Sequence, residues 1–194
     1  MLYLASQSPR RRQLLQQLGV DFNVLDVDVP ERRLTGETPA DYVSRVALEK
    51  ARAGLALLGD VPGRQVLGAD TEVVLDDVVF GKPSDELDAT GVLRRLSGRT
   101  HAVISTVWLV GDAGEYVESS VSQVRFDWLD EAIIAAYVAT GEPFGKAGAY
   151  AIQGRGAAFI AHLEGSFTGV MGLPVFETAR LLRRFGENGP LAHA

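Results

Sequence analysis

The chain has 194 residues, of which 46% are hydrophobic, and a formal net charge of −6 at pH 7. A chain of this length and composition can bury a core as one domain or as two closely packed lobes. Its acidic balance argues against a nucleic-acid-binding protein, which usually carries a broad basic face. No apolar run is long enough to cross a membrane, and no signal peptide precedes the first predicted strand. We therefore expect a soluble, cytoplasmic protein.

The residue types limit the chemistry further. With no cysteine, the chain has no disulfides, no thiolate metal sites and no cysteine nucleophile. The three histidines are too scattered for a zinc motif, so a metal would have to be held by oxygen ligands, as Mg²⁺ or Mn²⁺ is. Codon bias is our preferred explanation for the scarcity of lysine, but each lysine is also a candidate phosphate ligand. The lysines are Lys50, Lys82 and Lys146.

The first predicted elements flank the stretch "SQSPRRR". Residues 2–5 are apolar and form a short strand. Ser8 is a typical helix N-cap, Pro9 suits the first helical position, and Gly19 ends the helix. The three arginines after Pro9 therefore lie in or beside the first turn, where the helix dipole disfavours cations. Either they point into solvent, or they converge with free backbone N–H groups on an anion such as phosphate.

The later elements alternate between strands and helices, and no repeat or linker interrupts them. The pattern predicts a single α/β domain over residues 1–194. We expect strands at 22–25 and 64–70, a helix at 39–58 with Thr38 as N-cap, and a tight hairpin around Asp76 and Asp77. The remaining predictions are a helix at 85–96, long strands at 100–111 and 116–129, a helix near 130–139, a glycine-rich stretch at 141–156, a strand near 157–163, a helix at 174–185 and a frayed tail.

Two short motifs place charged side chains beside predicted turns. In "LGADTEVV", Asp70 ends an apolar strand, the place where α/β folds bind ligands. It could hold a metal or act as a general base with Thr71 beside it, but an aspartate that caps a turn fits equally well. In "FGKPSDE", Lys82 is held in a rigid turn, from which it reaches either a phosphate or only solvent.

The glycine-rich stretch "GEPFGKAGAYAIQGRG" indicates a loop that bends or approaches a ligand closely. It is not a phosphate-binding P-loop, because its glycine spacing is one residue short and Lys146 is followed by alanine. Tyr150 and Gln153 have the side chains that a nucleobase site uses. A buried Tyr150 and an exposed Gln153 without such a role are at least as consistent with the composition.

Several motifs together resemble those of the Maf family of nucleotide pyrophosphatases, over residues 2–185. They are "LASQSPRRRQLL", Glu31, "LEKA", "GADT", "GKP", "LSGRTHAV", "YVATGEPFGKAGAYAIQG" and "GSFTGVMGLP", in the family's order. Within the family the chain is similar to the branch that hydrolyses dTTP and UTP. The 7-methyl-GTP branch typically has Trp in place of Arg10, Gln in place of Thr71 and Glu in place of Gln153.

The resemblance implies an ITPase-like (Maf-type) α/β fold, a twisted mixed sheet with flanking helices and two lobes around a central cleft. The implied reaction is water attack on the α-phosphorus of a nucleoside triphosphate, which gives the monophosphate and pyrophosphate. The family works with a divalent cation, Mg²⁺ or Mn²⁺, and often forms homodimers. The family is also associated with the removal of unwanted nucleotides from nucleotide pools (house-cleaning) and with an influence on septum formation. The alternative is a nucleotide-binding regulator of cell division with little turnover.

The resemblance also assigns residues. Asp70 matches the proton acceptor, and Glu31 matches an acid that holds the metal together with Asp70. Arg12 is left to solvent. The other matched positions are Ser8, Arg11, Glu31, Lys50 and Lys82 for the phosphates, and Arg10, Thr71 and Gln153 for selection of the base.

Overall fold

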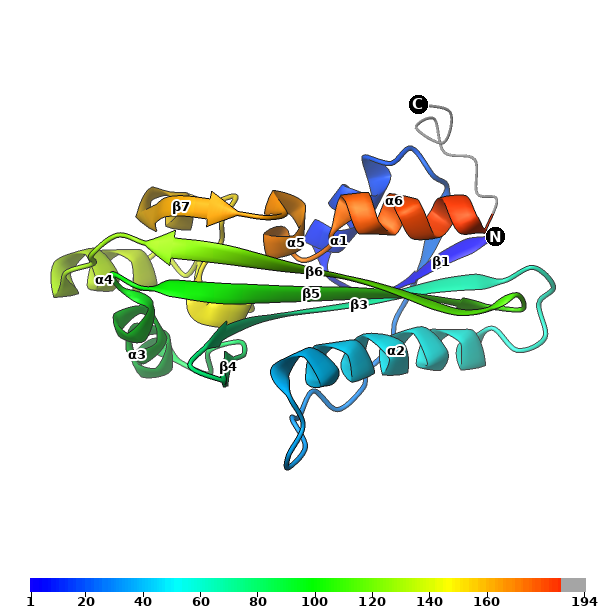
Figure 1. Ribbon diagram of the computed structural model, residues 1–194, viewed down its shortest axis with the longest axis horizontal. Helices are drawn as coiled ribbons and strands as arrows, with labels where there is room; N and C mark the ends of the chain where they lie inside the picture. Colours follow the sequence, from blue (N-terminus) through cyan, green and yellow to red (C-terminus); the bar gives the residue numbers. More distant parts are fainter. Residues whose placement is uncertain (186–194) are drawn as a thin grey trace.

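A seven-stranded mixed sheet forms the centre of the computed structural model, which describes residues 1–185 (Figure 1). The strand order is β2-β1-β3-β5-β6-β7, and β4 pairs with β3 beside this path. β1 is parallel to both β2 and β3, whereas every other pair is antiparallel. The expected mixed α/β sheet with flanking helices is therefore confirmed. The strands are β1 (Leu2–Ala5), β2 (Phe22–Leu25), β3 (Gln65–Leu75), β4 (Val78–Phe80), β5 (Thr100–Gly111), β6 (Gly114–Phe126) and β7 (Ile160–Glu164).

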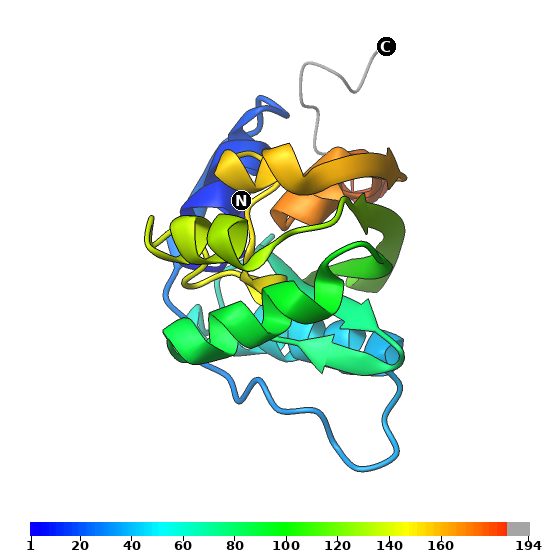
Figure 2. The ribbon, with the colours of Figure 1, turned by 90° about the vertical axis from the view of Figure 1, so that its left-hand side faces the viewer.

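Helices cover both faces of this sheet. The long helix α2 (Pro39–Leu57) packs along β3 and β5, and α6 (Val175–Arg184) packs on β5 and β6 from the opposite side (Figure 1). The short helix α5 (Phe167–Met171) lies on the same side as α6 and contacts α1 (Pro9–Gln16). Figure 2 shows the remaining pair, α3 (Glu86–Leu96) and α4 (Glu131–Val138), at one end of the sheet.

The residues predicted to cap helices and to form the hairpin turn adopt these roles in the structure. The Thr38 side chain accepts a hydrogen bond from the Asp41 amide at the start of α2, which satisfies a free N–H group of the first turn. Asp76 and Asp77 have φ angles of 53° and 61°, and two positive φ values are what a tight two-residue hairpin turn requires. Ser8 accepts from the Arg11 amide at 3.5 Å, so α1 begins where the sequence indicates.

The predicted end of the third strand at Asp70 is wrong. β3 continues through Asp70 to Leu75, because β5 pairs with it without interruption from Gln65 to Val74. Asp70 lies opposite Thr106 in the middle of this ladder. The sequence indicates the apolar run before Asp70 and the hairpin around Asp76 and Asp77 as separate elements, whereas the β5 residues that join them lie 28 to 36 positions away.

The last third of the chain also differs in detail from the prediction. The strand expected near 157–163 begins only at Ile160, because Arg155–Phe159 form a 3-10 helix. The short helix α5 and the 3-10 turn Ala147–Ala149 were not predicted. The expectations for the tail, for His193 and for the domain end at 194 lie outside the described residues.

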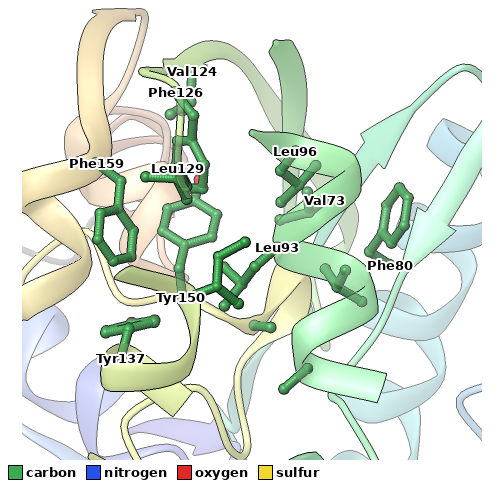
Figure 3. Close-up of a cluster of buried hydrophobic side chains, with 14 of the residues drawn as sticks. Val73, Phe80, Leu93, Leu96, Val124, Phe126, Leu129, Tyr137, Tyr150 and Phe159 are labelled. Carbon is green, nitrogen blue, oxygen red and sulfur yellow. The ribbon is translucent and has the colours of Figure 1, made fainter. Parts of the chain in front are cut away.

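Two large clusters of buried side chains form the core on the side of the sheet away from α2, and β3 contributes to both. Leu67 and Ala69 belong to the cluster beneath α1 and α6. Val73 and Leu75 belong to the other, which includes the aromatic side chains in Figure 3. Thr71 lies between the residues of β3 that belong to the two clusters.

The same part of β3 lacks a partner on one edge. β1 pairs with β3 only as far as Leu67, and β4 pairs with it only from Val73 onward. The intervening residues 68–72 pair with β5 alone. The carboxyl end of the parallel strand β1 meets this open edge, which is the kind of place where α/β proteins bind ligands.

None of the helices within residues 1–185 combines the length and the apolar character needed to cross a membrane.

Gly68 sets the distance between α2 and the open edge of β3. A Cβ at this position would lie 2.3 Å from the Ala47 carbonyl oxygen and 2.6 Å from the Ala51 backbone nitrogen. Because both atoms belong to the backbone of α2, Gly68→Ala must push the helix away, at a cost of about 1–3 kcal/mol. We expect thermal unfolding to move several degrees lower. The control Gly91→Ala meets nothing within 4 Å and should unfold no earlier than the native protein. Equal stability of the two variants would contradict this account.

Candidate active site

A cavity of about 1040 Å³ opens at the unpaired edge of β3. Its wall combines the end of β1, the start of α1, the middle of α2 and the glycine-rich stretch before β7. The structure brings all nine predicted site residues to this wall, although they come from positions 8 to 153 of the chain. They are Ser8, Arg10, Arg11, Glu31, Lys50, Asp70, Thr71, Lys82 and Gln153.

Asp70 forms the floor of the cavity and is only 4% exposed. Its Oδ1 accepts a hydrogen bond from Lys50 Nζ at 2.7 Å, and Arg11 Nη2 lies 3.9 Å from the same atom. Its Oδ2 is buried and has no hydrogen-bond partner among the described residues. A buried carboxylate with one paired oxygen and one free oxygen can still hold a metal or accept a proton.

Glu31 connects two lysines across the cavity. One of its oxygens lies 2.6 Å from Lys50 Nζ, and the other accepts from Lys82 Nζ at 2.8 Å. Burial by itself raises the pKa of Glu31, but the charges and hydrogen bonds of Lys50 and Lys82 outweigh this and lower it to about 2. Both of its oxygens therefore serve to position lysines in this structure.

The start of α1 holds one arginine firmly and presents another to the cavity. Arg11 donates from Nε to the Gly172 carbonyl at 2.8 Å and from Nη1 to the Ser6 hydroxyl at 3.3 Å, which directs its guanidinium toward Asp70. Arg10 is half-buried, and burial, followed by the charge of Arg11, lowers its pKa. Arg12 is exposed, as predicted.

Lys146 also lines the cavity; the scarcity of lysine made it a candidate phosphate ligand, although the resemblance gave it no role. Burial and then the charge of Arg10 lower its pKa, against the opposite influence of Glu142. Each of the chain's three lysines now lines the same cavity. The rarity of lysine was therefore an informative signal. Burial is the larger cause of both lowered pKa values, and a neighbouring arginine adds to each, Arg11 for Arg10 and Arg10 for Lys146.

Gln153 lies at the exposed edge of the cavity in a segment anchored on both sides. Before it, the Ala151 amide donates to the Tyr137 hydroxyl at 3.1 Å. After it, the amides of Arg155 and Gly156 both donate to the Glu142 carboxylate at 3.0 Å. Glu142 therefore holds Gln153 in place, which no sequence motif indicated.

Tyr150 and Thr71 are tied into the protein by their hydroxyl groups. Tyr150 is buried among the aromatic side chains of Figure 3, 3.0 Å from His101 Nε2, although it also touches the cavity. The Thr71 hydroxyl lies 2.7 Å from that of Ser105, which donates to the Gly169 carbonyl. The role of Thr71 in base selection stays a prediction.

At least one glycine of the glycine-rich stretch is required by close packing within the protein and not by a ligand. At Gly148 φ is 70°, and a Cβ there would lie 2.6 Å from Val73 Cγ2. This glycine brings the stretch against β3 and closes one wall of the cavity.

Glu72 is a cavity residue that the sequence analysis missed. It is 7% exposed, and its Oε2 is buried without a hydrogen-bond partner among the described residues. Burial, followed by the nearby negative charges of Asp70 and Glu31, raises the pKa of Glu72 to about 8. The predicted strand ended at Asp70 and so gave no signal for Glu72; the continuous strand β3 places both on one face, because alternate strand residues share a face.

These features define an α/β protein with a cleft suited to a phosphate-bearing ligand and to hydrolytic chemistry. Cations from α1, α2 and two loops surround a buried carboxylate with a free oxygen. The free carboxylate oxygens fit a hard divalent cation, and the cations fit several phosphate groups.

Comparison with known proteins identifies the family. The family model described as "Maf-like protein" matches residues 1–185. A dTTP/UTP pyrophosphatase from Xanthomonas campestris is 60% identical over 97% of this chain and 100% of that protein. A nucleoside triphosphate pyrophosphatase from Xylella fastidiosa is 56% identical over the same shares of the two chains. The solved Staphylococcus aureus Ham1 protein is 17% identical, with a TM-score of 0.47 over 64% of this chain and 71% of its own. The chain belongs to the Maf family.

The raised pKa of Glu72 predicts a pH-dependent stability for the metal-free protein. Between pH 4.5 and about 8 the folded state keeps a proton on Glu72 that the unfolded state loses. This contribution lowers the free energy of unfolding as pH rises, by up to about 1.4 kcal/mol per pH unit. Glu72→Gln should remove it and be more stable than the native protein at pH 9 in EDTA.

Urea unfolding at pH 5, 7 and 9 measures this difference. Glu164→Gln, at an exposed glutamate on β7, is the matched control and should follow the native protein. A Glu72→Gln curve parallel to that of the native protein at all three pH values would contradict the assigned pKa shift.

Proposed function

We propose that this protein hydrolyses dTTP and UTP to the monophosphate and pyrophosphate. Its relatives with 56–60% identity over nearly the whole chain are nucleoside triphosphate pyrophosphatases, and the chain is an enzyme of that class. The observation that carries the proposal is the free Oδ2 of Asp70 on the floor of a cation-lined cavity. The preference for dTTP and UTP rests on the resemblance and on the relatives' names.

Asp70 is suited to accept the proton of the attacking water. Lys50 Nζ and Arg11 Nη2 both lie near Oδ1, at 2.7 Å and 3.9 Å, and Oδ2 has no hydrogen-bond partner among the described residues. The water oxygen forms a bond to the α-phosphorus, the bond from this phosphorus to the bridging oxygen breaks, and the proton moves to the Asp70 carboxylate. The leaving pyrophosphate carries the electron pair of the broken bond.

The arginine and lysine side chains of the cavity also act on the leaving group. Arg11 is aimed by Gly172 and Ser6, while Lys82 and Lys146 approach from two loops. Such groups stabilise the charge that develops on the leaving pyrophosphate, and their positions are fixed before the reaction begins. A divalent cation, Mg²⁺ or Mn²⁺, held by Asp70 and a neighbouring carboxylate would neutralise part of the phosphate charge.

The site of attack can be read from the products. In ¹⁸O-labelled water with Mg²⁺, dTTP should give labelled dTMP and unlabelled pyrophosphate, because the water oxygen stays on the α-phosphorus.

Asp70→Asn should lower turnover by about 10²–10⁴ while nucleotide still binds. Phosphorus NMR and mass spectrometry of the products provide the measurement. Orthophosphate release, or nucleotide binding without any turnover as in a regulator of cell division, would overturn the proposal.

Arg10 and Gln153 are the side chains that we propose read the base. Both line the cavity, and Gln153 lies at its exposed edge on an anchored segment. A carboxamide offers a donor and an acceptor, which complement the O4 and N3–H groups of thymine and uracil. A carboxylate accepts only and favours the N1–H and amino group of guanine.

The double variant Arg10→Trp with Gln153→Glu tests this assignment. We expect the ratio of kcat/KM for dTTP to that for 7-methyl-GTP to fall by at least about tenfold, since an unmatched buried hydrogen-bonding group costs about 1–3 kcal/mol. Thermal unfolding of the single variant Gln153→Glu should change little, because Gln153 is exposed, and Arg10→Trp alone measures the effect of the half-buried position. An unchanged ratio would show that these two residues do not select the base.

A cytoplasmic location, homodimer formation, a house-cleaning role in nucleotide pools and an influence on septum formation are further proposals. They rest on the resemblance to the Maf family alone.

A further inference from the structure

Two buried carboxylates on the floor of the cavity have the same unusual environment. Asp70 and Glu72 alternate along β3 and therefore share the face of the strand that meets α2. Both line the cavity and both are more than nine-tenths buried. Asp70 Oδ2 and Glu72 Oε2 each lack a hydrogen-bond partner among the described residues. Buried carboxylate oxygens are normally paired, so two such atoms on one face point to a ligand that carries positive charge.

The lysines of the cavity do not fill this role. Lys50 is shared between Asp70 Oδ1 and Glu31, at 2.7 Å and 2.6 Å. Lys82 contacts the other oxygen of Glu31 at 2.8 Å. The two lysines therefore occupy both oxygens of Glu31 and one oxygen of Asp70. The oxygens left without a partner are those on the strand.

We propose that Asp70 and Glu72 are the two protein carboxylates that hold the divalent cation, and that Glu31 instead positions Lys50 and Lys82. Mg²⁺ typically takes one or two carboxylates and completes its shell with water and substrate phosphates. In keeping with this, residues 1–185 contain no group of three or more histidine, cysteine or acidic side chains arranged to hold a metal by itself. The proposal rests on the proposed function only for the phosphate ligands.

Glu72 is a better ligand than Glu31 for a physical reason. A metal on Glu31 must first displace a lysine that lies within 2.8 Å of each of its oxygens. A metal held by Asp70 Oδ2 and Glu72 Oε2 displaces no hydrogen-bond partner among the described residues and compensates two buried carboxylates at once. It leaves Lys50 and Lys82 where they are, available to the phosphates.

Binding of Mn²⁺ to the intact protein tests the proposal without using turnover. Free Mn²⁺ is measured from its EPR signal, with the protein alone and saturated with the α,β-imido analogue of dUTP, which resists hydrolysis. Glu72→Gln should weaken Mn²⁺ binding by at least about tenfold, as Asp70→Asn should, because divalent-cation affinity depends on the number of charged ligands. Glu31→Gln should weaken it much less, and the exposed-site control Glu164→Gln should bind as the native protein does.

Native-like Mn²⁺ affinity in Glu72→Gln would overturn the proposal, as would a loss in Glu31→Gln that matches the loss in Asp70→Asn. Circular dichroism and the urea curves show whether each variant is folded, and Glu72→Gln is expected to be at least as stable as the native protein without metal. A failure of the proposed function is distinguishable, because it would appear as absent pyrophosphate release in the native protein whatever the Mn²⁺ affinities are.

Discussion

The contact between Lys50 and Asp70 is the interaction on which the rest of the site depends. The two charged groups are buried at 2.7 Å, and each would be costly to bury without the other. Lys50 reaches Asp70 because Gly68 lets α2 lie directly against β3. The same lysine also contacts Glu31 and so fixes the loop that carries this acid. One close approach of helix and strand therefore sets the positions of three charged residues.

Around this pair the protein keeps charges that its own residues do not neutralise. Lys146 lies in the field of Arg10, Arg10 lies in that of Arg11, and Glu72 is buried beside Asp70 without a cation of its own. Such an arrangement lowers stability in the absence of ligand, because burial removes hydration from groups whose charges are not balanced nearby. We propose that a metal and a triphosphate supply the missing charges together. The charges in the site are thus balanced by the proposed ligands and not by one another.

The sequence determined most of the local structure. Proline and a capping side chain at Ser8 and Thr38 start two helices, and the paired aspartates at 76 and 77 form a tight turn, because these residue types act within a few positions of the chain. Nine site residues could also be assigned from motifs and found at one cavity. Even the scarcity of lysine carried information, since all three lysines meet there.

Only the tertiary structure decided where those residues stand relative to one another. Asp70 reads as the end of a strand, but pairing with β5 extends β3 past it and places Glu72 on the same buried face. The anchoring of Gln153 by Glu142 depends on backbone amides that no motif describes. The resemblance makes Glu31 a metal ligand, and the fold places a lysine beside each of its oxygens, which no motif indicated. The sequence by itself determined which chemical groups are present, because residue types and caps act locally. The fold decided which of their atoms remain free, because strand pairing and burial join distant parts of the chain.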